Sequence, residues 1–66
     1  MNQSKLEKLG FRIEFLPSGR INLCNKHQFR INGTTAYLCT KGEFARTFEQ
    51  KSISSLLSYI QKIEFV

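Results

Sequence analysis

The chain has 66 residues, a formal net charge of +5 and an apolar fraction of 41%. A chain of this length forms one domain, residues 1–66, with a thin core, and it hardly supplies the walls of a deep catalytic cleft. The apolar fraction is too high for a disordered chain, and no stretch approaches the roughly 20 apolar residues of a membrane span. We therefore expect a small binding protein, not an enzyme, in the cytoplasm of its cell or host.

The cysteines and the histidine match no catalytic or metal-binding pattern. Cys24 and Cys39 lie 15 residues apart and His27 is the only histidine; this spacing fits neither a zinc motif nor the disulfide framework of a secreted domain. The sequence has no Gly-rich phosphate loop and no paired-carboxylate spacing. No spacing pairs His27 with a nucleophile or an acid. We expect two reduced thiols, no metal and no cofactor.

The first element that the sequence predicts is a short helix over residues 4–9. Ser4 begins a capping-box pattern at its start. Leu6 and Leu9 would face inward, and Gly10 would end the helix. A helix this short does not persist alone, so we expect it to dock on the rest of the domain.

A hairpin is predicted next. Residues 11–16 alternate apolar and charged side chains, which indicates a half-buried strand. Residues 17–19, Pro-Ser-Gly, suit a three-residue hairpin loop, and residues 20–25 form the return strand. This loop sets Phe15 opposite Ile21, so that nearly all the large apolar side chains meet on one face.

A second hairpin follows a short polar connector. Asn32-Gly33 lies between two alternating stretches, residues 28–31 and 34–40, and this dipeptide is the strongest short signal for a hairpin. The turn sets Ile31 opposite Thr34 and, further along, Phe29 opposite Ala36.

The last third of the chain contains one ambiguous segment and one clear helix. In residues 43–49, Phe44 and Phe48 have helical i, i+4 spacing but also alternate with Arg46 as in a strand, and we slightly favour an extended segment. Ser52 is a good N-cap residue for the helix that follows. Its apolar stripe has helical spacing and consists of Ile53, Leu56, Leu57, Ile60 and Ile63.

These elements predict an α+β fold in which the two consecutive hairpins form one four-stranded antiparallel sheet. The C-terminal amphipathic helix would pack on its apolar face. That face would carry Phe11, Ile13, Phe15, Ile21, Leu23, Phe29, Ile31, Ala36 and Leu38. One helix covers only one side of a sheet, which leaves the other side for water or for a partner.

The uncovered face is the candidate site. The first 42 residues hold seven Lys/Arg against two Glu, an asymmetry that points toward an anionic partner. Arginines match phosphates in charge and geometry, and a tyrosine ring offers a surface on which a base can stack. The residues expected on this face or at its edges are Arg12, Arg20, Lys26, Arg30, Tyr37 and Lys41. A merely solvated face would have the same pattern.

Three functions are consistent with this sequence. The first is a nucleic-acid-binding protein that uses the basic sheet face. The second is a small inhibitor or adaptor, of the anti-CRISPR-like kind found in phages and mobile elements, that docks through its basic surface on an acidic patch of a host protein or nuclease complex. The third is a small RNase that uses His27. None of the three requires a membrane, and the oligomeric state is left open.

Two families resemble the chain in outline. The order helix, strands, helix, with the sequence Leu-Glu-Lys-Leu-Gly-Phe at residues 6–11, is similar to HicA-type toxin RNases of the double-stranded-RNA-binding-domain kind. Those carry a Gly-Ser-His motif that this chain lacks, so the resemblance implies no catalytic role for His27. The sheet followed by Phe48 and an amphipathic helix also resembles the arm-site DNA-binding domains of tyrosine recombinases, which implies DNA binding through the sheet face.

Overall fold

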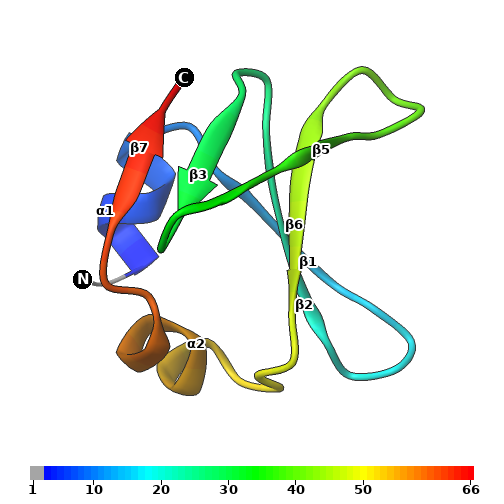
Figure 1. Ribbon diagram of the computed structural model, residues 1–66. Coiled ribbons are helices and arrows are strands. Elements are labelled where there is room, and N and C mark those ends of the chain that lie inside the picture. Colours follow the sequence, from blue (N-terminus) through cyan, green and yellow to red (C-terminus); the bar gives the residue numbers. More distant parts are fainter. Residues whose placement is uncertain (1–2) are drawn as a thin grey trace.

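The computed structural model describes residues 3–66 as a small α+β fold with two antiparallel sheets and two short helices (Figure 1). The four-stranded sheet has the order β1-β2-β6-β5, and the three-stranded sheet has the order β4-β3-β7. The elements are α1 (Gln3–Lys8), β1 (Arg12–Phe15), β2 (Ile21–Asn25), β3 (Phe29–Ile31), β4 (Thr34–Thr35), β5 (Tyr37–Leu38), β6 (Phe44–Phe48), α2 (Ile53–Tyr59) and β7 (Ile63–Phe65).

The core lies between the two sheets and is closed by the two helices. In Figure 1, β3 and β7 stand on one side, β1, β2 and β6 on the other, and α2 lies across the bottom. Each of these layers contributes buried apolar side chains. The core cluster consists of Leu6, Phe11, Ile21, Leu23, Phe29, Ile31, Ala36, Phe48, Leu56 and Ile60.

Helix α1 ends as expected, but it begins and faces differently. The Phe11 N–H donates to the Leu6 carbonyl and the Gly10 N–H to the Glu7 carbonyl, which is the hydrogen-bond pattern of a Schellman motif. Gly10 has φ +92°, a conformation that glycine adopts without strain. Ser4 lies inside the helix and is not its cap. The prediction that Leu9 faces inward was wrong, because its side chain is exposed just beyond the last turn.

Both predicted hairpin turns are confirmed. Phe15 pairs with Ile21 across the first loop, as its length required. At the second turn Asn32 and Gly33 both have positive φ, as a type I′ turn demands. Ile31 pairs with Thr34, and the Ala36 N–H donates to the Phe29 carbonyl.

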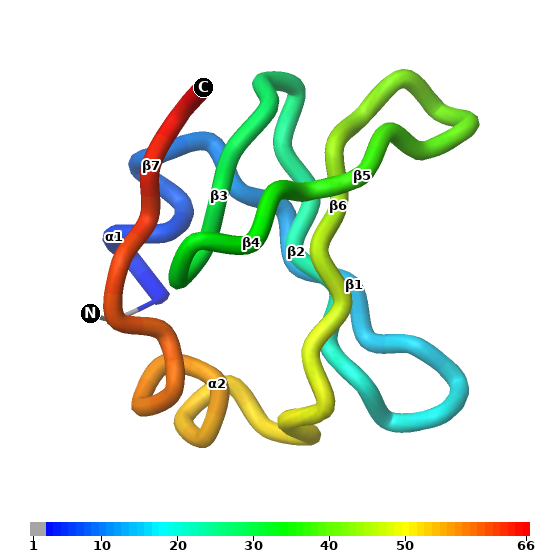
Figure 2. Tube along the Cα trace, in the orientation of Figure 1, coloured from blue at the N-terminus to red at the C-terminus, as the bar shows by residue number. Residues whose placement is uncertain are grey.

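The prediction that the two hairpins form one sheet was wrong. β2 pairs with β1 on one side and with β6 on the other, so it has no free edge to offer β3. Residues 43–49 contain strand β6, as the favoured alternative held. β3 instead begins the second sheet, and the chain returns to the first sheet at Ala36, between β4 and β5 (Figure 2).

The C-terminal helix is shorter than predicted, and its last apolar position belongs to a strand. The Ser52 side chain accepts a hydrogen bond from the Ser55 N–H, which confirms the N-cap. Helix α2 ends before Ile60, whose backbone is extended. Ile63 lies in β7 opposite Ile31 and not on the helix. One apolar residue at the right distance fits a helical stripe and a following strand equally well.

Asn32 holds this junction through its side chain. Its Oδ1 accepts hydrogen bonds from the backbone N–H groups of Gln61 and Lys62 at 3.0 and 2.9 Å, and its Nδ2 donates to the Tyr59 carbonyl at 3.3 Å. The same residue that forms the tight turn therefore satisfies the backbone groups left free where α2 ends.

Two residues expected on the apolar face are exposed. Phe15 and Leu38 have 64% and 65% of their surface accessible. They lie on β1 and β5, the two outer strands of the four-stranded sheet. The smaller sheet and the helices cover the centre of this sheet and leave parts of its edges bare.

We predict that Asn32→Gly lowers the free energy of unfolding by about 2 kcal/mol. Glycine accepts the positive φ, so the substitution removes mainly three side-chain hydrogen bonds, each contributing about 0.5–1.5 kcal/mol. Urea unfolding of both proteins measures the difference. Asn32→Asp, which keeps the Oδ1 acceptor, should lose less. Equal stability of the glycine variant and the original chain would contradict this role of the side chain.

Candidate functional site

The outer face of the four-stranded sheet carries two of the predicted site residues, Arg12 and Tyr37. The strand register places Arg12, Cys24, Ala45 and Tyr37 in one row across the four strands. Strands lie about 4.8 Å apart, so the two ends of this row are separated by about 14 Å. Arg12 and Tyr37 therefore share a face but lie at its opposite edges.

Hydrogen bonds connect these two edges through the neighbouring row. The Tyr37 hydroxyl lies 3.1 Å from Thr47 Oγ1, which donates to Asn22 Oδ1 at 3.0 Å. Asn22 Nδ2 donates to Glu14 Oε1 at 3.4 Å. Arg12 completes the chain with one hydrogen bond of 2.6 Å to Glu14 Oε2. This outer face is a connected polar network and not an open basic surface.

Arg12 is the cation of this network and is already paired with two carboxylates. Its guanidinium donates to Glu43 and to Glu14, each at 2.6 Å. The hydrogen bonds to Glu43 and Glu14 raise the pKa of Arg12, and the hydrogen bonds from Arg12 and Asn22 lower the pKa of Glu14. Two carboxylates therefore neutralise the charge that Arg12 would offer to a phosphate.

The other four predicted site residues are spread over both sheets and the connector, and only Lys41 shares a contact with Arg12, through Glu14. Arg20 pairs with Glu49 at 3.3 Å beside the first hairpin loop, and Lys41 lies 4.0 Å from Glu14 at the β5–β6 turn. Arg30 is exposed on β3 in the other sheet. Lys26 lies in the connector between β2 and β3. The structure therefore does not bring all six residues to one face, because Arg30 belongs to the other sheet and Lys26 to the connector, and Arg12, Arg20 and Lys41 lie within 4.0 Å of carboxylates.

The cations that remain without an ion pair give a different distribution. Among residues 3–66, four of the five glutamates are paired, namely Glu14, Glu43, Glu49 and Glu64. Within residues 3–66, the Lys and Arg side chains with no ion pair are Lys8, Lys26, Arg30, Arg46 and Lys51. Two of these, Lys8 and Lys26, line the same pocket.

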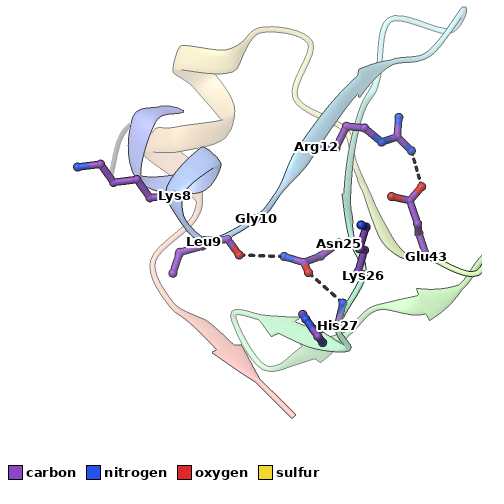
Figure 3. Close-up of a pocket in the computed structure, with 8 residues that line it drawn as sticks. All are labelled: Lys8, Leu9, Gly10, Arg12, Asn25, Lys26, His27 and Glu43. Atoms are coloured by element: carbon purple, nitrogen blue, oxygen red, sulfur yellow. Dashed lines mark hydrogen bonds and ion pairs between the residues drawn. The ribbon is translucent and has the colours of Figure 1, made fainter.

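This pocket, which we name the connector pocket, lies between the end of α1 and the β2–β3 connector (Figure 3). Its volume is about 480 Å³, and it is lined by Lys8, Leu9, Gly10, Arg12, Asn25, Lys26, His27 and Glu43. In Figure 3 the Lys8 side chain extends outward at one end, while the Arg12–Glu43 pair lies at the other. Lys26 and His27 come from the connector between them.

Asn25 fixes the walls of the connector pocket. It is the last residue of β2 and is 2% exposed. Its Nδ2 donates to the Leu9 carbonyl at 3.2 Å, and its Oδ1 accepts from the His27 N–H at 2.9 Å. One buried amide therefore ties the end of α1 to the connector, so that Gly10, Lys26 and His27 line the same pocket.

The chemistry of the connector pocket suits an anion. Lys26 and Lys8 supply charge that no carboxylate of residues 3–66 neutralises, and the exposed His27 adds a ring with hydrogen-bonding nitrogens. Within the described part of the chain, no hydrogen bond joins the His27 ring to another side chain. The pocket therefore holds cationic and polar groups without the nucleophile–base pair that covalent catalysis uses.

A second pocket, the α2 pocket, contains the most unusual charge of the fold. Arg46 lies opposite the fully buried Leu23, so it points toward the core side of the sheet. Its guanidinium carbon lies 5.1 Å from the centre of the Phe48 ring, and its buried Nε has no hydrogen-bond acceptor. Such a donor costs about 1–3 kcal/mol. The pocket, of about 240 Å³, is lined by Arg46, Thr47, Phe48, Glu49, Gln50 and Tyr59.

Neither a metal site nor a membrane span is seen in residues 3–66. No three His, Cys, Asp or Glu side chains gather there in a way that could hold a metal ion. The helices of this part of the chain are too short to cross a membrane. Comparisons with family models, curated proteins and solved structures found no match to the chain.

Sequence reasoning included Arg12 and Lys26 of the connector pocket but missed Asn25, and it missed Arg46 of the α2 pocket. The partners of Asn25 are distant in sequence, and only its place at the end of an apolar strand marked it. Arg46 did have a signal, because alternation in the segment Phe-Ala-Arg-Thr-Phe puts it on the same face as the two phenylalanines. A charge between two apolar side chains of one strand face indicates a functional or strained position.

We predict that iodoacetamide labels Cys39 in the folded protein and leaves Cys24 unmodified. Burial, and next the charge of Glu14, raise the pKa of Cys24 to about 11, so its thiol stays protonated at about pH 8. Cys39 is only half buried. Mass spectrometry of the labelled peptides measures both sites, and unfolding in urea is the positive control for Cys24. Equal labelling of both cysteines in the folded protein would contradict the burial of Cys24.

Proposed function

We propose that this protein binds nucleic acid and that the connector pocket receives the phosphate backbone. The observation that carries the proposal is the pairing pattern of the charges. Most carboxylates are paired on or beside the four-stranded sheet, and two of the unpaired lysines line one pocket. Neutralisation of phosphates by such lysines releases counterions, which supplies most of the affinity of small basic proteins for nucleic acid.

The proposal keeps the predicted function but moves its site. Lys26 remains in the site, and Lys8 and His27 join it. Arg12 remains at the rim, where it is held by Glu43 and Glu14 and positions the pocket wall more than it attracts an anion. Arg20, Lys41 and Tyr37 take part in contacts within the protein.

We predict that Lys8→Gln with Lys26→Gln weakens binding to short DNA and RNA at low salt. Each lysine that contacts a phosphate contributes about one unit to the slope of log affinity against log salt concentration, so the double variant should lose about two units. Fluorescence anisotropy across a salt series measures this slope.

The matched control is Arg30→Gln with Lys51→Gln. Like Lys8 and Lys26, these two side chains have no ion pair within residues 3–66, and they lie outside the connector pocket. It should lower affinity less and leave the slope nearly unchanged. Equal effects of the two double variants would mean that binding is diffuse over the surface. Absence of any binding at low salt would refute the proposed function.

A second candidate function, docking on a host protein, is supported by one observation. Phe15 and Leu38 are large apolar side chains with about two thirds of their surface exposed, 64% and 65%, on the outer strands of the four-stranded sheet. Exposed apolar residues rimmed by polar ones are typical of protein interfaces. The two side chains lie on opposite outer strands, so a partner of the inhibitor or adaptor kind would cover one or both of these sheet edges.

For this candidate we predict capture of one host protein that nuclease treatment does not release. Phe15→Ser with Leu38→Ser should abolish the capture, because it removes apolar area that the partner would cover. Val66→Ser is the control, since Val66 is equally exposed at 68% but lies at the C-terminus. Capture that nuclease abolishes would favour nucleic-acid binding instead.

A further inference from the structure

The α2 pocket contains Arg46, whose guanidinium has no hydrogen-bond acceptor or ion-pair partner among residues 3–66. Arg46 points toward the core side of β6, stacks over Phe48 and keeps a buried Nε without an acceptor. Among residues 3–66 it forms no ion pair. An apolar residue between Phe44 and Phe48 would fill this position at lower cost, so the arginine indicates a ligand that accepts hydrogen bonds.

The other residues that line the α2 pocket indicate what kind of ligand would fit. Tyr59, in the last turn of α2, is 48% exposed and meets the Phe48 ring edge to face at 6.2 Å. The Asn32 side chain holds the Tyr59 carbonyl and so restrains this end of the helix. The pocket thus combines an accessible aromatic ring with a planar cation.

The polar groups of the α2 pocket select against a simple anion and against an apolar ligand. Within the described part of the chain, Arg46 and Glu49 are the only charged residues in the lining, so the α2 pocket offers a free phosphate no net positive charge, unlike the connector pocket. A purely apolar ligand would cover the Arg46 guanidinium, which has no hydrogen-bond or ion-pair partner among residues 3–66, without giving it an acceptor. A planar polar ring meets both requirements, since it is uncharged and can accept hydrogen bonds. Its face can stack on Tyr59, and its edge can accept from Arg46 and exchange hydrogen bonds with the Gln50 amide.

We propose that the α2 pocket takes one unpaired nucleobase, which makes the partner of this protein a single-stranded nucleic acid. This inference rests on the proposed function, in which the connector pocket holds phosphates. In a duplex each base is stacked and paired, so its face is not available to a side chain. A single strand can turn a base outward into a pocket at little cost.

The test compares three ligands at low salt: a short single strand of oligouridylate or oligodeoxythymidylate, an abasic strand with the same number of phosphates, and the corresponding duplex. We expect the single strand to bind about tenfold more tightly than the abasic strand, since stacking of one base on an aromatic side chain has roughly this effect. Fluorescence anisotropy measures all three affinities.

Variants of the pocket locate the base. Tyr59→Ala should lower affinity for the single strand about tenfold and leave the abasic strand unchanged, while Tyr59→Phe, which keeps the ring, should retain most of the affinity. Arg46→Lys keeps the charge but loses the planar group, and it should also weaken only base-dependent binding. In the unaltered protein, the Tyr59 ring and Arg46 Nε–H resonances should shift with the single strand and not with the abasic one.

The outcomes separate this inference from the proposed function. Equal binding of the single and abasic strands, or a duplex bound as tightly as the single strand, would overturn the base pocket and leave phosphate binding intact. Base-dependent binding that neither Tyr59→Ala nor Arg46→Lys weakens, with no shift of the two resonances, would also overturn it. Absence of binding to all three ligands would overturn both proposals.

Discussion

The pairing of β2 with β6 is the constraint on which the rest of the fold depends. It joins residues 21–25 to residues 44–48 over five register positions. With β1 on its other side, β2 has both edges occupied and all five of its residues buried. The chain must therefore turn away from the sheet after Asn25. The segment between β2 and β6 first forms β3 and β4 of the second sheet and then returns to the first sheet as β5.

Both pockets follow from this departure and return. The turn after β2 is fixed by the Asn25 amide against the end of α1, which opens the connector pocket. The register of β6 against β2 sets Arg46 opposite Leu23 and thus directs a charge toward the core side. Ala36 crosses between the sheets with almost no side chain, which lets one strand segment belong first to one sheet and then to the other.

The separation of charges has a similar origin. The outer face of the four-stranded sheet collects residues from β1, β2, β5 and β6, and these complete one another's hydrogen bonds from Tyr37 to Glu43. Polar side chains on this face therefore stabilise the sheet. The groups left for a partner lie where the chain leaves the sheet, at the connector and near the end of α2.

Local chemistry made part of this fold predictable. Turn residues with required φ angles predicted both hairpins and their registers, and Ser52 predicted the start of α2, because each depends on neighbours in sequence. Which strand pairs with a given edge depends on residues far apart in sequence. The sequence therefore predicted β3 beside β2, where the structure has β6. The sequence did not predict the ion pairs of Arg12 for the same reason. Arg12 and Glu43 are 31 residues apart, and their pairing depends on the sheet order.

Asn32 and Gly33 give the molecule a slower chemical ageing than their sequence suggests. Asn-Gly is prone to deamidation, which begins when the glycine nitrogen attacks the asparagine side-chain carbon. In this fold the Asn32 side-chain amide is fixed by hydrogen bonds: its oxygen and its nitrogen are both bound to the backbone between Tyr59 and Lys62. The contacts that join the turn to the end of α2 thus restrain the movement from which cyclisation to a succinimide would start.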